Sequence, residues 1–272
     1  MQNCMNIVWQ QRLASHLKKA KKPLLVLLGP TASGKTVFSI EVAKWVNSLP
    51  HAPHPNPLPR GEWTQAEIIN ADSRQLYKYM DIGTAKITTE EMEDIPHHLF
   101  SILDPKEKVT VGWYKQTAER TIDDVLSRGN IPILVGGSML YISAVTDGYV
   151  FTGKGGKHVV PVPYDILILG LSRPRSELVQ RIGERTSHLL QNGWIIEVEY
   201  LLTHGYAVHD LGMKSHGYRE IAEWILDGKN AEKLPVLTEQ INAATRQYAK
   251  RQMTWWKRDE RIQWIPCTSL PP

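Results

Sequence analysis

The chain has 272 residues, of which 42% are hydrophobic and 22% charged, and a formal net charge of +4. That is enough to bury the core of one domain with an appendage, or of two small ones. No apolar run approaches the ~20 residues of a membrane-spanning helix, and the N-terminus does not resemble a secretory signal. Cys4 and Cys267 are too few for a disulfide framework or a zinc site. We therefore expect a protein of the reducing cytoplasm with no membrane attachment.

Short aliphatic runs mark the expected strands, with helical patterns between the first three. They cover residues 24–28, 66–70, 131–135 and 166–171. Strands that alternate with helices predict a parallel sheet. Between the first helix and the second strand, residues 50–61 carry proline at nearly alternate positions, which removes backbone donors and excludes a helix or central strand. We interpret this segment as a surface insertion.

The second half of the chain changes character. The glycine-rich stretch 148–163 is interpreted as a flexible connection, and helical patterns dominate from Arg173 onward, with a long last helix expected over 236–258. The predicted organisation is an α/β core over 1–172, followed by helices over 173–272 that pack back on it.

The most informative motif is Gly29-Pro30-Thr31-Ala32-Ser33-Gly34-Lys35-Thr36, directly after an apolar strand and before a helical pattern. This GxxxxGK[ST] spacing directs backbone N–H groups at a polyphosphate, adds a lysine for its charge, and offers a hydroxyl to Mg²⁺. The positive end of the following helix favours the same anion. The motif predicts phosphate binding, but by itself it does not identify the phosphate compound.

A second block follows the expected second strand, and Asp72 stands at its end. Ligands gather at the carboxyl ends of strands in such sheets. Asp72 could be the Mg²⁺ aspartate of a nucleoside triphosphatase or a general base, and the competing structural interpretation is a helix cap. Gly136 and Gly137 end the third strand, where a triphosphatase would be expected to carry an acid. Glycines there indicate a sharp turn or the close approach of a ligand, and so a substrate passage.

The fourth block lies on the last helix, where basic residues form a ridge beside Tyr248, Trp255 and Trp256. Such a ridge could pair with RNA phosphates, although a charged helix face is more often only solvated. His97 and His98 could form a metal pair by composition. A packing role is favoured because no further ligand is near them in the sequence.

Taken together, the blocks resemble one family, the tRNA dimethylallyltransferases, also called tRNA isopentenyltransferases. The segments that carry the resemblance are GPTASGKT, ADSRQLYKYMDIGTAK, PHHLFSILDP, ILVGGSMLYISAV, GYRE and RQYAKRQMTWWKR, in this order over most of the chain. The implied fold is α/β, a P-loop NTPase-like parallel sheet flanked by helices with a helical C-terminal part. The implied reaction moves a dimethylallyl group from its pyrophosphate to the exocyclic N6 amine of the adenosine 3′-adjacent to the tRNA anticodon, with Mg²⁺ as cofactor.

The resemblance also implies roles for single residues. Asp72, Thr31 and Arg219 would be catalytic, and Thr36 would reach the metal. The pyrophosphate ligands would be Gly29, Pro30, Thr31, Ala32, Ser33, Gly34, Lys35, Thr36 and Arg219. The surface for the tRNA anticodon stem-loop would comprise Ser73, Arg74, Gln75, Asp81, Gly83, Thr84, Lys86, Arg246, Gln247, Lys250 and Arg251. A monomer is expected.

The chain departs from the family near residues 148–163, where relatives carry a helical insertion that grips the anticodon stem-loop. Much of that RNA clamp is expected to be absent. Three alternatives therefore stay open: prenylation of a free adenine nucleotide, a non-catalytic RNA-binding remnant, and a small-molecule kinase, which Gly136 and Gly137 disfavour.

Overall fold

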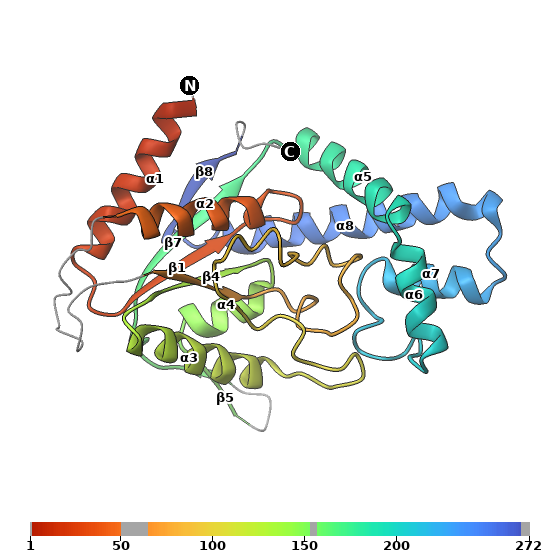
Figure 1. Cartoon of the computed structure of the whole chain (residues 1–272), viewed down its shortest axis with the longest axis horizontal. Helices are drawn as coiled ribbons and strands as arrows, with labels where there is room; N and C mark the ends of the chain where they lie inside the picture. Colours follow the sequence, from red (N-terminus) through yellow and green to blue (C-terminus); the bar gives the residue numbers. More distant parts are fainter. Residues whose placement is uncertain (1, 50–64, 153–156, 268–272) are drawn as a thin grey trace.

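The computed structural model describes residues 2–49, 65–152 and 157–267, so the proline-rich segment 50–61 lies outside the described residues. At its centre is a six-stranded sheet in the order β3-β2-β4-β1-β7-β8 (Figure 1). The strands are β1 (Pro23–Leu28), β2 (Ala66–Asn70), β3 (His97–His98), β4 (Ile131–Gly136), β7 (Asp165–Ser172) and β8 (Ile262–Pro266). All neighbours in this sheet pair in parallel. The expected α/β fold is confirmed.

The central strands are buried and mostly apolar because helices cover both faces of the sheet. Every residue of β1 and β2 is buried. In Figure 1, α2 (Lys35–Ser48) lies on one side of the sheet, and α3 (Val111–Ser127) and α4 (Met139–Thr146) lie on the other. A strand buried on both sides has no polar alternation, which explains why the four long strands were recognisable as continuous aliphatic runs.

The N-terminal helix α1 (Gln2–Leu17) is not among the elements that the sequence predicted. It packs through Trp9, whose ring lies edge-on to Phe38 at 5.5 Å and to Trp45 at 5.3 Å between centroids. Leu13 is fully buried beside it. α1 therefore extends the layer of α2 and is part of the core.

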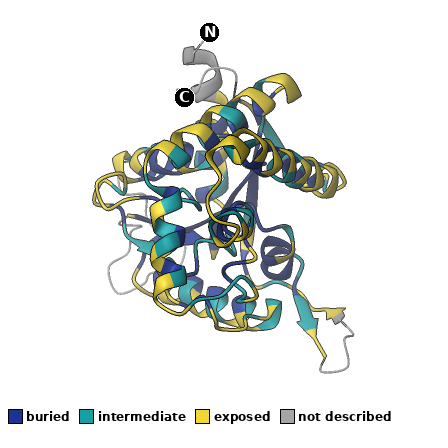
Figure 2. Cartoon of the chain, turned by 90° about the vertical axis from the view of Figure 1, so that its right-hand side faces the viewer, coloured by how far each residue is buried: buried dark blue, intermediate teal, exposed yellow. Residues whose placement is uncertain are grey.

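The C-terminal part consists of α5 (Arg175–Gln191), α6 (Trp194–Thr203), α7 (Tyr218–Leu226), the 3₁₀ turn η1 (Ala231–Lys233) and α8 (Leu234–Trp256). The last helix runs over 234–256, two residues earlier at each end than the predicted 236–258. α8 leads back to the sheet, where β8 joins β7 as an edge strand that the sequence had not indicated. Figure 2 shows the exposed outer faces of these helices and the buried strands behind them. No helix in the described ranges is long and apolar enough to cross a membrane.

The stretch 148–163 is partly regular, which corrects its interpretation as a flexible connection. β5 (Tyr149–Phe151) and β6 (Lys157–Val159) pair antiparallel, with Tyr149 opposite Val159. Phe151 and Val159 are exposed. The two strands are short and present apolar side chains outward, so the aliphatic pattern that identifies a buried strand is missing here.

Candidate active site

The loop between β1 and α2 has the backbone shape that its glycines predict. Gly34 caps α2 with φ +96°, a conformation that glycine adopts without strain. A Cβ on Gly29 would lie 2.8 Å from Ser33 Oγ. Lys35 arches back over the loop and donates to the Gly29 and Pro30 carbonyls at 3.0 and 2.9 Å. The loop is therefore folded as an anion cradle at the start of α2.

Two arginines from the C-terminal part bind backbone carbonyls of this loop. Arg173 Nε donates to the Ser33 carbonyl at 3.0 Å, and Arg181 Nε donates to the Ala32 carbonyl at 2.9 Å. Both carbonyls are thereby bound by arginines at the start of the C-terminal part. Sequence reasoning missed both residues, because neither belongs to a motif that indicates phosphate binding.

Asp72 stands directly after β2 and is fixed by its neighbours. Its backbone N–H donates to Asn70 Oδ1 at 2.8 Å, and its Oδ1 accepts the Arg74 N–H at 2.9 Å. A Cβ placed on Gly137 would lie 3.7 Å from the other oxygen, Oδ2. One carboxylate oxygen is thus used to hold a turn, and the other faces the end of β4.

The space beside the two glycines is filled by protein atoms, which corrects their interpretation as a substrate passage. A Cβ on Gly136 would lie 2.2 Å from the backbone of Ala71, and one on Gly137 would lie 2.6 Å from Gln252 Nε2. Gly136 lets β2 and β4 approach closely at their carboxyl ends. Gly137 makes room for a side chain of α8.

A cavity lies between the loop, the end of β2 and the C-terminal helices. Its lining combines polar groups from all three parts with aromatic rings, namely Thr31, Asp72, Arg74, Gly83, Thr84, Ile182, Arg185, Thr186, Leu189, Trp194, Ser215, His216, Tyr218, Ile241, Thr245 and Tyr248. Members of the predicted pyrophosphate, catalytic and RNA-contact sets therefore lie at one place, namely Thr31, Asp72, Arg74, Gly83 and Thr84. Such a concave site with convergent polar groups is the default candidate for a binding site.

Two cations, Arg185 of the cavity lining and Lys35 of the adjoining loop, interact with the Asp72 carboxylate. Burial lowers the pKa of Lys35 from its ordinary 10.5 to about 8, with Asp72 opposing and Arg185 reinforcing that shift. Burial also lowers the pKa of Arg185, again opposed by Asp72. Positive charge held in a place that disfavours it would be stabilised by an arriving pyrophosphate. Arg185 is a site residue that sequence reasoning missed.

Arg219, predicted as the second pyrophosphate ligand, lies elsewhere. It is on the outer face of α7, its side chain is 61% exposed, and it pairs with Glu223 one turn along at 2.8 Å. It is not part of the cavity lining. Arg74 and Arg185 are the arginines that line the cavity, and the pyrophosphate role of Arg219 stays a prediction. The GYRE motif contributes Tyr218 instead, because α7 turns that residue inward.

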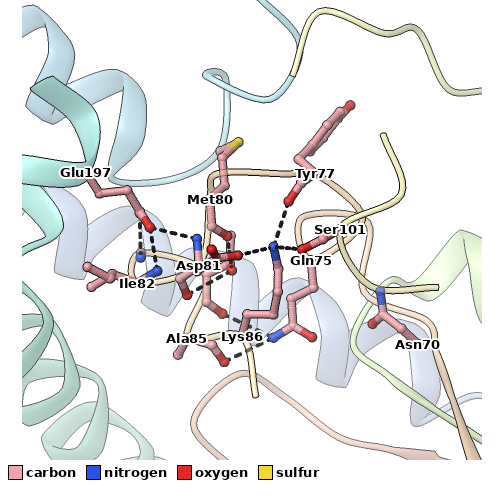
Figure 3. A network of polar contacts seen from close by, with 12 residues as sticks. Asn70, Gln75, Tyr77, Met80, Asp81, Ile82, Ala85, Lys86, Ser101 and Glu197 are labelled. Atoms are coloured by element: carbon pink, nitrogen blue, oxygen red, sulfur yellow. Dashed lines mark hydrogen bonds and ion pairs between the residues drawn. The ribbon is translucent and has the colours of Figure 1, made fainter. Parts of the chain in front are cut away.

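The loop 81–86 was predicted to contact RNA, but much of it is used for its own shape (Figure 3). Lys86, only 6% exposed, donates to the Tyr77 carbonyl, to Asp81 and to Ser101 Oγ. Gln75 Nε2 donates to the carbonyls of Thr84 and Ala85, both at 3.2 Å. These side chains therefore hold the loop whose Gly83 and Thr84 line the cavity, and a direct RNA contact for them stays a prediction.

Helix α8 contributes both to the cavity and to an outer surface. Tyr248 donates to the Gly137 carbonyl at 3.2 Å, and burial raises its pKa to about 12. Of the predicted RNA contacts, Gln247, Lys250 and Arg251 are exposed. Arg246 pairs with Glu239 at 2.6 Å. The basic residues of α8 lie on the surface, and their contact with RNA stays a prediction.

Ser73, the residue after Asp72, lies close to the end of β4, where its backbone N–H donates to Ser138 Oγ at 2.8 Å.

The two histidines, His97 and His98, form β3 at the edge of the sheet. His98 Nε2 contacts buried Glu67 at 2.5 Å, and His97 Nδ1 lies 2.6 Å from the Ile95 carbonyl, so both have packing roles in β3. Within residues 2–49, 65–152 and 157–267, no cluster of three or more His, Cys, Asp or Glu side chains could hold a metal.

The parallel sheet, the loop after β1 and the cavity at the carboxyl ends of the strands define a P-loop α/β protein. Comparison with known proteins narrows this class. The sequence model of the family described as IPP transferase matches residues 75–161 and 151–259, which is more than half of the chain. The chain belongs to this family.

Comparison with individual relatives supports the same family assignment. A tRNA dimethylallyltransferase of Carboxydothermus hydrogenoformans is 34% identical over 305 aligned positions, covering 89% of this chain and 91% of that protein. The crystal structure of a tRNA isopentenylpyrophosphate transferase from Staphylococcus epidermidis has a TM-score of 0.76 and 30% identity, covering 92% and 94%. The enzyme of the same description from Bacillus halodurans has a TM-score of 0.76 and 28% identity, covering 92% and 91%.

Proposed function

We propose that this chain transfers a dimethylallyl group from dimethylallyl pyrophosphate to the exocyclic N6 amine of the adenosine 3′-adjacent to the tRNA anticodon. The observation that carries the proposal is that a phosphate-binding loop and the Asp72 carboxylate line one cavity, in a member of a family whose named relatives are tRNA dimethylallyltransferases. The RNA substrate supports a cytoplasmic location, and a monomer stays our expectation.

In the reaction, the bond between C1 of the dimethylallyl group and the pyrophosphate oxygen breaks, and a bond between C1 and N6 forms. The N6 proton passes to Asp72, whose Oδ2 is not used by the turn that holds Oδ1. Negative charge grows on the leaving pyrophosphate, and Lys35, Arg185 and the loop N–H groups would stabilise it. The Thr31 hydroxyl would donate to an oxygen of the same group.

Mg²⁺ fits the residues present. Thr36 is exposed at the start of α2, next to the cradle. Mg²⁺ prefers oxygen ligands and usually binds few protein groups together with substrate phosphates. In loops of the GxxxxGK[ST] pattern, the Ser/Thr hydroxyl is such a ligand. When bound there, the ion would neutralise part of the pyrophosphate charge.

RNA recognition would rest on the core surface and α8. The alignment with the Carboxydothermus protein is longer than this chain, so it leaves part of that relative unmatched, and the two matched pieces of the family model meet at residues 151–161. Both observations support the expected shortening near residues 148–163. Exposed Lys250 and Arg251 would then supply phosphate contacts that are sensitive to salt.

The test is to incubate the protein with Mg²⁺, dimethylallyl pyrophosphate and unmodified tRNA, and to search digested RNA for prenylated adenosine by mass spectrometry. Asp72→Asn should lower kcat by about 100-fold or more, the usual loss when a general base is removed. Asp227→Asn, at an exposed ion pair with Lys233, is the matched control. Absence of the product with folded protein would overturn the proposal. Product from AMP, ADP or ATP instead would favour a free nucleotide as the acceptor.

A further inference from the structure

The side chain of Glu197, on α6, accepts hydrogen bonds from three backbone N–H groups of the loop that lines the cavity. Glu197 Oε2 accepts the N–H groups of Asp81 and Ile82, both at 2.7 Å, and Oε1 accepts that of Gly83 at 3.1 Å. Tyr218 donates its hydroxyl to Oε1 as well. Figure 3 shows Glu197 reaching from α6 toward the backbone of Asp81 and Ile82. Three consecutive backbone donors thus point at one side chain.

The chemistry of this contact requires an ionised carboxylate. All four partners of Glu197 are donors, and a carboxylate is an acceptor at both oxygens. A glutamine in its place would turn an NH₂ group toward backbone N–H groups. Hydrogen bonds to a charged group are worth more than neutral ones, and an unpaired donor in a part-buried place carries a desolvation cost.

The loop connects this contact to the pyrophosphate site. Directly after Gly83, the Thr84 carbonyl accepts a hydrogen bond from Arg185 Nη2 at 3.2 Å. Gly83 itself is pressed against Trp194, where an added Cβ would lie 1.8 Å from the indole Nε1. The backbone between Glu197 and the Thr84 carbonyl therefore has little freedom to shift.

We infer that Glu197 is a positioning residue: by holding the N–H groups of residues 81–83 it fixes the Thr84 carbonyl, which orients the Arg185 guanidinium for pyrophosphate. The inference rests on the proposed function for its substrate. The inference predicts that Glu197 and Arg185 are energetically coupled in pyrophosphate binding. If Glu197 acts through Arg185, removing Arg185 first must abolish most of the effect of changing Glu197 on pyrophosphate affinity.

The experiment measures two quantities for each variant: the Kd for inorganic pyrophosphate with Mg²⁺, by calorimetry, and the KM values for dimethylallyl pyrophosphate and tRNA. The variants are Glu197→Gln, Arg185→Ala and their double mutant. Glu199→Gln, on the same helix and paired with Lys229, is the matched control. Tyr218→Phe removes one of the four donors and serves if Glu197→Gln does not fold.

For Glu197→Gln we expect the Kd for pyrophosphate and the KM for dimethylallyl pyrophosphate to rise about tenfold, the scale of a lost charged hydrogen bond. Tyr218→Phe should raise both about twofold to threefold, Glu199→Gln should change neither, and the KM for tRNA should move less in every case. In the Arg185→Ala background, the same changes should add less than a further twofold.

Equal effects in the two backgrounds would overturn the inference, since they would show that Glu197 supports the fold without acting through Arg185. Unchanged pyrophosphate affinity in the single mutants would overturn it as well. A wild-type protein that binds pyrophosphate but prenylates no RNA would contradict the proposed function alone, because the pyrophosphate Kd tests the inference without turnover.

Discussion

Gln252 joins the phosphate-binding loop to the end of β4. Its Oε1 accepts the Thr31 N–H at 2.9 Å, and its Nε2 donates to the Gly137 carbonyl at 2.7 Å. The side chain is 1% exposed, so both bonds are shielded from water. A residue near the C-terminal end of α8 therefore sets the distance between the anion cradle and the strand end that faces Asp72.

Replacing Gln252 by alanine should raise the KM for dimethylallyl pyrophosphate and lower kcat. The substitution leaves the Thr31 N–H without its partner and leaves the Gly137 carbonyl only the Tyr248 hydroxyl as a donor. A buried group left unsatisfied costs about 1–3 kcal/mol. We expect kcat/KM to fall at least tenfold in steady-state assays. Gln240→Ala is the matched control, because it removes the same side chain from an exposed position of the same helix. Equal losses in the two variants would contradict the role given to Gln252.

The assignment of the second guanidinium can be decided by a pair of substitutions. Arg185→Ala should raise the Kd for pyrophosphate by tenfold or more, because a charged hydrogen-bond donor is lost from the cavity. Arg219→Ala should leave that Kd within about twofold, because its exposed pair with Glu223 contributes little. Calorimetry on both variants gives the comparison. A larger loss in Arg219→Ala would restore the prediction made from the GYRE motif.

The lowered pKa of Lys35 predicts a dependence on pH. In the free protein Lys35 is protonated below about pH 8 and loses its charge above it. The rate constant kcat/KM for dimethylallyl pyrophosphate reports the free enzyme, so it should decline as the pH rises through about 8. Lys35→Arg should be less active but should not show this alkaline decline, since arginine stays charged. An unchanged decline in Lys35→Arg would assign it to another group.

Stability should change in the opposite direction. The folded pKa of Lys35, about 8, lies below its ordinary 10.5, so the unfolded chain binds more protons between these two values. The unfavourable contribution of Lys35 is complete below pH 8 and is relieved as the pH rises from about 8 to about 10.5. Wild type should therefore gain stability relative to Lys35→Met over that window, as measured by denaturant unfolding.

The sequence predicted the parts of the site that are local in the chain. The cradle, Asp72 and the long buried strands each follow from a motif or an apolar run. Arg173, Arg181, Arg185 and Gln252 could not be found in this way, because each contacts residues more than 100 positions away. Such contacts depend on which face of a helix packs against the rest of the protein, and that is decided by the tertiary structure. The GYRE motif likewise predicted a helix, but only the packing of α7 shows that Tyr218 is buried and Arg219 exposed.

Two glycines of the chain should respond to alanine in opposite directions. Gly136→Ala places a Cβ 2.2 Å from the Ala71 backbone, which cannot move aside as a flexible side chain would. Overpacking of this kind typically costs about 1–3 kcal/mol, and it should also disturb Asp72, the residue after Ala71. Gly183, inside α5, has no atom within 4 Å of its added Cβ. Gly183→Ala should therefore stabilise the chain by about 0.5–1 kcal/mol through the better helix propensity of alanine. Denaturant unfolding of both variants measures the two signs, and a neutral Gly136→Ala would contradict the close approach of β2 and β4.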